Sequence, residues 1–322
     1  MKETVNITNF KSDIEMISAD SNVLLNFLQK HRLDGIELML CDKWDSNIFP
    51  KDLIVGNHLP FYPNWMDFWL GKKDVLQLEF GTEETIIAQF GGLDRESWLE
   101  KYRQQILAAG ETEPEYMVFH VGNVRYEETF SWNFYYDDEA VIDATLDVLE
   151  ELSDCIPSDT WLLLENLWWP GLRLTDRHLA EKIVAKSPHQ KTGIMLDIGH
   201  LLATNNDIRT QEEGAAYIQQ ILKGLGELCG MIKGVHLHQS LPGEYLREQA
   251  GSVPKSYGVR DVARHVHRID YHAPWSSRIV HEALSSIAPD WLTHEFLQRS
   301  LLHWDEQLKV QIAAWRMYDM ET

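Results

Sequence analysis

Four short apolar runs in this chain each end on a side chain that can bind a metal. Glu165 ends WLLLE, Asp197 ends GIMLD, His236 ends KGVH, and Glu295 ends WLTHE. Runs of this length are typical of strands that are buried on both faces. A buried carboxylate costs free energy unless a partner neutralises it, and carboxylates combined with imidazole suit Zn, Mn, Fe or Mg. The pattern therefore predicts a divalent-metal enzyme with its site at the carboxyl ends of parallel strands.

Further candidate ligands stand close to the ends of similar runs. They are His58 in VGNHLPFYP, His120 in VFHVGNV, His200 in LDIGH, and Asp270 with His272 in DYHAPW. An ordinary turn before Pro274 is the alternative for the last pair. Because side chains on a strand alternate with period two, His238 shares a face with His236. This second histidine can be a metal ligand, or it can contact a ligand or the substrate.

Strand-like and helix-like segments alternate along the whole chain. The expected strands are 4–8, 34–40, 52–58, 115–121, 161–165, 192–197, 232–238 and 291–295. The clearest expected helices are 22–31, 97–109, 139–152, 175–187, 212–229 and 300–318. This order predicts a single-domain α/β protein over 1–322, a closed (β/α)₈ TIM barrel. A doubly wound open sheet would need a glycine-rich phosphate turn after its first strand, and the sequence has none there.

The composition of the chain disfavours several classes of binding partner. The chain has 322 residues and a formal net charge of -21, which disfavours duplex nucleic acid and anionic membrane surfaces. Its three cysteines form no CxxC pair, so a thiolate metal site or a disulfide framework is not expected. Neither a secretory signal nor an apolar run long enough for a membrane span is evident. We expect a cytoplasmic enzyme with a small-molecule substrate, and the oligomeric state stays open.

The same motifs resemble the xylose isomerase-like TIM barrels, the superfamily that also holds endonuclease IV, over residues 1–318. NHLPFY and FHVG look like the settings of the first two histidine ligands of endonuclease IV. LLLEN resembles the segment whose glutamate bridges two metals there, and DIGH is similar to its D-x-x-H. HLHQS looks like its H-x-N-D-S, DYH like its D-x-H, and THEF carries the last-strand glutamate.

This resemblance implies a site with one to three divalent ions. Glu165 would bridge two of them. The implied ligands of one ion are Asp197, His236 and Glu295; of a second, His58 and His120; and of a third, His200, Asp270 and His272. Glu165, Glu295 and His200 are then the expected catalytic residues. The implied activity is hydrolysis of a phosphoester in a bulky small molecule. Some relatives are phosphodiesterases that remodel cobamides, which makes a cobamide one candidate substrate.

Two other functions stay open. The sugar isomerases and epimerases of the superfamily hold one metal with the Glu, Asp, His, Glu set. In the epimerases the two glutamates, here Glu165 and Glu295, act as proton acid and base, and His200 would touch the substrate. A barrel that only binds a metal or a ligand is the remaining alternative, and it predicts that Glu165→Gln leaves function intact.

Two long connections are candidates for substrate recognition. Residues 59–96 and 239–264 follow the third and seventh expected strands. Aromatic side chains crowd 61–69 and 130–136, and Trp168 and Trp169 follow Glu165; they form either an apolar substrate pocket or the local core of these segments. Residues 239–278 are locally cationic, and Lys255 and Arg260 can either grip a phosphate or face solvent on a mixed-charge helix.

Overall fold

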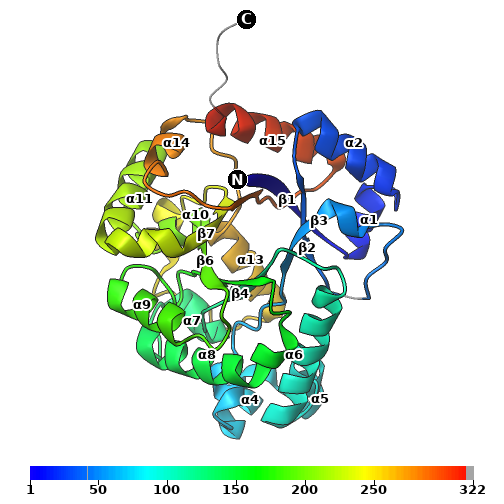
Figure 1. The fold of residues 1–322 in the computed structure, drawn as a ribbon. Helices are drawn as coiled ribbons and strands as arrows, with labels where there is room; N and C mark the ends of the chain where they lie inside the picture. The colour runs from blue at the N-terminus through cyan, green and yellow to red at the C-terminus, as the bar shows by residue number, and fades with distance from the viewer. Residues whose placement is uncertain (42, 317–322) are drawn as a thin grey trace, which may run out of the picture.

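The strands close into a ring. The computed structural model describes residues 1–41 and 43–316, and eight parallel strands of this region pair in chain order, with β8 returning to β1 (Figure 1). The strands are β1 (Lys2–Thr8), β2 (Gly35–Met39), β3 (Ile54–His58), β4 (Tyr116–His120), β5 (Trp161–Glu165), β6 (Thr192–Asp197), β7 (Ile232–Leu237) and β8 (Trp291–His294). Every predicted strand is present, and each bound agrees within two residues. The predicted (β/α)₈ barrel is confirmed.

Helices surround this ring. Those described are α1 (Lys11–Met16), α2 (Ser21–His31), α3 (Met66–Trp69), α4 (Lys73–Phe80), α5 (Glu83–Phe90), α6 (Arg95–Gly110), α7 (Tyr126–Ser131), α8 (Asp138–Leu152), α9 (Arg177–Lys186), α10 (Ile198–Leu202), α11 (Gln211–Leu225), α12 (Gly243–Gln249), α13 (Val259–Ile269), α14 (Ile279–Ala283) and α15 (Leu301–Trp315). Three 3₁₀ turns, Lys51–Leu53, Ser153–Cys155 and Gly226–Met231, precede β3, β5 and β7.

The six predicted helices correspond to α2, α6, α8, α9, α11 and α15. Helix α11 ends at Leu225, because the predicted stretch to 229 continues as a 3₁₀ turn. Asp94 caps α6 and Asp176 caps α9 by accepting hydrogen bonds from backbone N–H groups of the first turn, which sets where these helices begin. Residues 317–318 of the predicted helix 300–318 lie outside the described residues.

The two long connections contain extra helices. The segment after β3 forms α3, α4 and α5 before α6 begins, and the segment after β7 forms α12, α13 and α14. Helix α13 packs against α7 and projects onto the ring of strands in Figure 1, whereas α11, α14 and α15 lie outside the ring. Both connections follow carboxyl ends of strands, which is the end where barrel enzymes build their sites.

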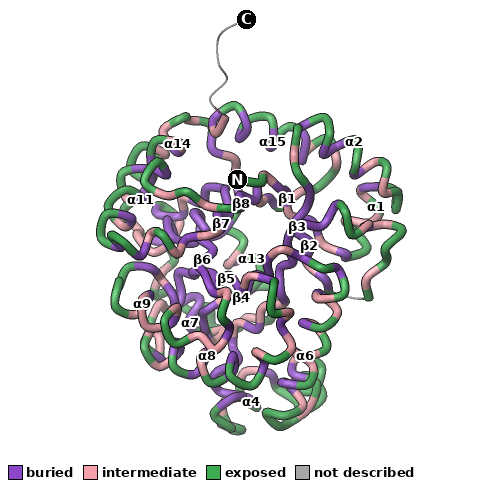
Figure 2. Tube along the Cα trace, viewed as in Figure 1, coloured by how far each residue is buried: buried purple, intermediate pink, exposed green. Residues whose placement is uncertain are grey.

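Buried residues, purple in Figure 2, lie along the strands and on one face of most helices. Inside the lower part of the barrel, Val55, Tyr116, Val118, Leu163, Met195 and Trp291 pack on one another. This apolar layer fills the barrel, so a polar site can only form above it, towards the carboxyl ends of the strands. None of the helices in the described residues is long and apolar enough to cross a membrane.

Candidate metal centre

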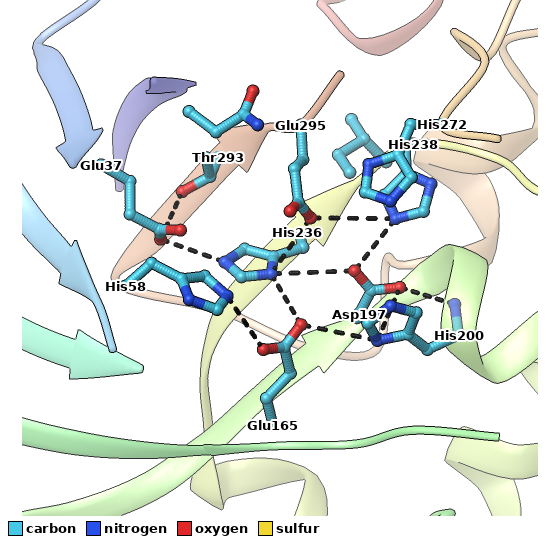
Figure 3. Close-up of polar contacts among 12 residues, drawn as sticks. Glu37, His58, Glu165, Asp197, His200, His236, His238, His272, Thr293 and Glu295 are labelled. Carbon is cyan, nitrogen blue, oxygen red and sulfur yellow. Dashed lines mark hydrogen bonds and ion pairs between the residues drawn. The ribbon is translucent and has the colours of Figure 1, made fainter. Parts of the chain in front are cut away.

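The strand ends bring the expected ligands together. His58, His120, Glu165 and Asp197 are the last residues of β3, β4, β5 and β6. Neighbouring strands of the barrel run parallel, so their final side chains form part of one ring. His236, near the end of β7, and Glu295, directly after β8, complete it (Figure 3). The side chains are buried or nearly so, which makes their charges matter.

The first donor group consists of His58, His120 and Glu165. Glu165 Oε2 lies 3.3 Å from His58 Nε2 and 3.1 Å from His120 Nε2. One donor atom from each of the three residues falls within 4.8 Å of the others.

The second donor group consists of Glu165, Asp197, His236 and Glu295. His236 Nδ1 is its centre: Glu165 Oε1 lies 3.0 Å away, Glu295 Oε2 3.3 Å and Asp197 Oδ2 3.7 Å (Figure 3). Glu165 thus faces the first donor group with one oxygen and the second with the other. This is the arrangement that a carboxylate bridging two cations requires.

The third donor group consists of His200, Asp270 and His272. Asp270 Oδ2 lies 3.2 Å from His200 Nε2 and 2.7 Å from His272 Nε2. Its other oxygen accepts a hydrogen bond of 2.8 Å from the buried Ser240 hydroxyl, which also accepts from the backbone N–H of His272. The long segment after β7 therefore returns Asp270 and His272 to the barrel mouth rather than leaving them in a distant turn.

Backbone carbonyls fix which ring nitrogen of two histidines carries the proton. His58 Nδ1 lies 3.0 Å from the carbonyl oxygen of Leu59, and His200 Nδ1 lies 2.9 Å from that of Asn166. A carbonyl only accepts, so Nδ1 donates in both cases. The Nε2 lone pair is left directed at the donor groups, as a metal ligand requires.

The carboxylates and imidazoles of the site shift one another's pKa values. Burial alone would raise the pKa of Asp197, but the nearby imidazoles of His200 and His238 outweigh it and hold the pKa below its ordinary value. Burial would lower the pKa of His272, yet Asp270 and Glu295 raise it to about 9. By contrast, burial lowers the pKa of His120 to about 3. Acidic groups thus attract positive charge into the centre of the site.

Two buried carboxylate oxygens without hydrogen bonds indicate that a bound cation could supply this positive charge. Glu165 Oε2 and Glu295 Oε2 are buried, and among the described residues neither meets a hydrogen-bond donor with acceptable geometry. A buried carboxylate oxygen left in this state is costly. Divalent cations would satisfy both oxygens, and the mix of carboxylate and imidazole donors suits Zn, Mn or Fe. The residues present therefore fit a metal centre.

His238 lies beside the second donor group. Its Nε2 is 2.9 Å from Asp197 Oδ2 and 3.8 Å from Glu295 Oε2. Gly199 makes room for this ring, because a Cβ at Gly199 would lie 2.0 Å from His238 Cε1. The glycine of the DIGH motif is thus required by the packing of a histidine that directly follows β7.

The aromatic pair after β5 packs in the interior. Trp168 and Trp169 are 2% and 5% exposed, so they form local core rather than an open pocket face. Trp168 still borders the site, with its ring centroid 5.1 Å from that of His200. Phe61 is only partly buried and stacks on His120 at 4.5 Å between centroids. Phe61 therefore places a partly exposed aromatic ring directly beside the first donor group.

The two basic residues considered for phosphate binding, Lys255 and Arg260, lie on the surface. Lys255 precedes α13 and Arg260 is in its first turn; both are exposed. Within the described part of the chain, no hydrogen bond or ion pair joins either side chain to the donor groups.

Glu37 is a site residue that the motifs at strand ends do not reveal. It lies inside β2 and is 1% exposed, and its Oε2 is 3.0 Å from His236 Nε2. The available signal was a charged residue inside the apolar run GIELML, since such a charge needs a buried partner.

Comparison with known proteins agrees with this architecture. The family described as Xylose isomerase-like TIM barrel matches residues 73–295, well over half of the chain. The chain belongs to the xylose isomerase-like TIM barrel family. The match includes every donor residue except His58. A search of curated proteins finds no match.

Solved structures of several enzymes resemble the whole chain at low identity. Endonuclease IV from Thermus thermophilus is 15% identical, with a TM-score of 0.52 and 98% of each chain covered. The probable 3-DHS dehydratase AsbF from Bacillus anthracis is 13% identical, with a TM-score of 0.50, covering 98% of this chain and 100% of that one. A D-tagatose 3-epimerase-like protein is 18% identical, with a TM-score of 0.49, covering 98% and 97%. Family and neighbours are enzymes of different reaction types, so these likenesses support the fold alone.

Proposed function

We propose that this protein hydrolyses a phosphoester in a bulky small molecule, using two or three divalent cations. The observation that carries the proposal is the position of Glu165, whose two oxygens face two separate donor groups. A third donor group lies alongside, with His200 Nδ1 3.5 Å from Glu165 Oε1. An enzyme that needs a single cation has no use for three adjoining sets of ligands.

Each donor group would hold one cation. His58 and His120 would hold the first with Glu165; Asp197, His236 and Glu295 the second, again with Glu165; and His200, Asp270 and His272 the third. Bound cations would supply activation of water and neutralisation of charge on the phosphoryl group. In this proposal Glu165, Glu295 and His200 are the catalytic residues.

The surrounding residues prepare the ligands. The carbonyls of Leu59 and Asn166 keep the Nε2 lone pairs of His58 and His200 directed inward. Asn166 also joins the ends of β5 and β6: its side-chain oxygen accepts from the backbone N–H of Asp197, and its amide donates to the carbonyl of Asp197. The ligands from these two strands are thereby held in register before any substrate arrives.

The substrate in this proposal is a small molecule with an apolar part near the phosphate. Phe61 offers a partly exposed ring beside His120. A net charge of -21 disfavours a duplex polyanion, which needs a cationic surface. Lys255 and Arg260 would meet only a substrate that extends over the exposed segment before and at the start of α13. A cobamide has the size and the planar ring to do so.

Metal content and a hydrolysis screen test the proposal together. The purified protein should carry about two to three equivalents of metal per chain, as a multi-metal site implies. It should release product from a generic phosphodiester, bis(p-nitrophenyl) phosphate, and a screen of nucleotide-containing diesters, cobamides and abasic DNA would define the class. The Glu165→Gln variant should lose the activity. Wild-type protein with a full metal complement that cleaves no diester would contradict the proposal.

A single-metal sugar isomerase or epimerase is the second candidate. The second donor group alone supplies its Glu, Asp, His, Glu set. Burial raises the pKa of Glu295, which is what a residue acting as proton acid requires. Exchange of deuterium from solvent into a carbon of the substrate would support this candidate, as would about one equivalent of metal. Phosphoester hydrolysis produces no such exchange.

A further inference from the structure

We propose that Glu37 is a positioning residue that fixes the tautomer of His236 and thereby sets how tightly the second donor group binds its cation. The inference rests on the metal centre of the proposed function, and it assigns a role to a residue outside the three donor groups.

Glu37 and His236 form a fully buried pair inside the barrel. Glu37 Oε2 lies 3.0 Å from His236 Nε2 (Figure 3). The two side chains come from β2 and β7, which are separated in the ring by β1 and β8. Both are shielded from water, with at most 1% of either residue exposed. The geometry of this contact is that of a hydrogen bond, and a buried carboxylate is stabilised by each donor that it meets.

The surroundings of His236 decide which nitrogen donates. Three carboxylates of the second donor group gather at Nδ1, while Nε2 faces Glu37. A neutral imidazole has one donor nitrogen and one acceptor nitrogen. If Nε2–H donates to Glu37, the Nδ1 lone pair is directed into the second donor group. The pair therefore has the carboxylate–histidine–metal arrangement, in which the outer carboxylate orients the ring and raises its basicity.

Two hydroxyl groups hold the Glu37 carboxylate in place. Oε2 accepts a hydrogen bond of 2.7 Å from Tyr116 and one of 3.1 Å from Thr293. The two hydroxyls are themselves 3.1 Å apart, and Thr293 is also 2.9 Å from the hydroxyl of Thr4. Charge-assisted donors of this kind keep the carboxylate ionised and in one orientation.

Gly56 explains how the Tyr116 ring reaches Glu37. Gly56 on β3 is paired with Tyr116 on β4 and, on the opposite edge of β3, with Glu37 on β2. A Cβ at Gly56 would lie 2.1 Å from Tyr116 Cζ. The glycine thus leaves the space through which the tyrosine crosses β3 towards β2. Gly56, Tyr116, Glu37 and His236 form one continuous support beneath the metal centre.

A direct ligand role for Glu37 is the competing explanation. Glu37, His58 and His236 also bring donor atoms within 4.8 Å of one another, and Glu37 Oε1 has no hydrogen-bond partner among the described residues. A cation there would need the Nε2 lone pair of His236, which would turn the proton-bearing nitrogen towards the carboxylates of the second donor group. The two roles therefore predict opposite tautomers.

The tautomer is measured on the wild-type protein. Zinc-loaded protein labelled with ¹⁵N-histidine should show His236 with Nε2 protonated and Nδ1 bound to metal. A metal-bound Nε2 would overturn the inference. This readout needs no variant and no catalytic activity.

Zinc affinity of variants gives the second readout, by competition with a chelator. Glu37→Gln should weaken the second donor group about 10–100-fold, the usual effect of losing an outer carboxylate, and should leave the number of sites unchanged at saturating zinc. Tyr116→Phe keeps Glu37 but removes one of its donors, so it should produce a smaller loss in the same direction.

Asp305→Asn is a matched control. Asp305, on α15, is a buried carboxylate whose Oδ1 lies 2.8 Å from Nε2 of His31, on α2. This pair resembles Glu37 and His236, but it lies between two outer helices and away from the donor groups. The Asp305→Asn substitution should lower stability and leave zinc affinity as in the wild type. A folded Glu37→Gln protein with unchanged affinity would overturn this inference alone. Loss of a whole equivalent from Glu37→Gln at saturating zinc would assign a ligand role instead. A wild-type protein that binds no metal would remove the proposed function as well.

Discussion

His238 and His272 stack face to face, with ring centroids 3.9 Å apart and planes within 4° of parallel. His238 follows β7, whereas His272 is reached only after α12 and α13. Each ring points Nε2 at a carboxylate, His238 at Asp197 and His272 at Asp270. The stack thus couples the second donor group to the third, and displacing one ring should disturb both.

Gly199→Ala tests this coupling. Its Cβ would lie 2.0 Å from His238 Cε1, so the ring must move and its hydrogen bond to Asp197 must break. We expect a loss of about 1–3 kcal/mol in the free energy of unfolding, the usual cost of overpacking, and weaker zinc binding. Chemical denaturation and chelator competition measure the two effects.

Two further variants test whether the clash with His238 causes the loss of stability in Gly199→Ala. Adding His238→Ala to Gly199→Ala removes the clash and should restore part of the stability. Gly224→Ala, in α11, adds a methyl group where nothing lies within 4 Å, and it should stabilise by about 0.5–1 kcal/mol. Equal stability of the Gly199→Ala and Gly224→Ala proteins would show that the ring is not held there.

The three donor groups predict how much metal each of three variants loses. His120→Asn affects only the first group, and Asp270→Asn only the third, so each should lower the metal content by about one equivalent. Glu165→Gln removes the residue shared by the first two groups. It should lower the metal content by about two equivalents and abolish diester hydrolysis, because these cations would activate the attacking water. Elemental analysis after dialysis measures the content. His267→Ala, a histidine exposed on α13, is the control and should change nothing. Identical losses from all three variants would argue for one cation.

Glu79 gives the stability of the protein a pH dependence away from the donor groups. Burial raises the pKa of Glu79 to about 7, although its Oε1 accepts hydrogen bonds from the Tyr126 backbone and from Asn64. The ordinary value is 4.5, so the folded state binds the extra proton between these two values. Stability from this group is complete below about pH 4.5 and is lost as the pH rises to about 7.

Glu79→Gln should remove this dependence. The amide is neutral at every pH, so at pH 8 the variant should be more stable than the wild type by up to about 3 kcal/mol, the free energy of the full pKa shift. At pH 4.5 the two proteins should differ little. Urea unfolding at both pH values measures this, and Glu127→Gln, a neighbouring glutamate, serves as control. A Glu79→Gln protein that is less stable at pH 8 would contradict the assignment.

Sequence patterns located the barrel because its strands are short, mostly apolar runs, several of which end on a candidate ligand. Glu165 and Asp197 show this clearly: each ends such a run, and each lies at a strand end in the structure. The pairing of Asp270 and His272 with His200 was predicted from the family resemblance and not from any local pattern. It depends on the path of α12 and α13, whose tertiary packing brings residues distant in sequence back to the barrel.

Glu37 and the tryptophans show where sequence reasoning ends. Glu37 lies in the middle of β2, and its partner His236 lies on β7, so only the pairing of β8 with β1 that closes the barrel brings them together. Trp168 and Trp169 follow β5, the strand that ends on Glu165, which made them candidates for substrate contact. Their burial depends on packing by Leu246 and Ile269 from the segment after β7, and no local pattern encodes that.

Phe61 is therefore the better test of substrate recognition than the buried tryptophans. Its ring stacks on His120 and remains partly exposed, so a bound substrate can lie against it while the metal ligands stay in place. Phe61→Leu should raise KM about 5–30-fold, in line with the loss of about 1–2 kcal/mol of aromatic contact, with metal content unchanged. Trp161→Leu provides the control, since Trp161 is a partly exposed aromatic residue at the opposite end of the strand that carries Glu165. Loss of metal from Phe61→Leu would instead show that the ring supports His120, and an unchanged KM would place the substrate elsewhere on the barrel mouth.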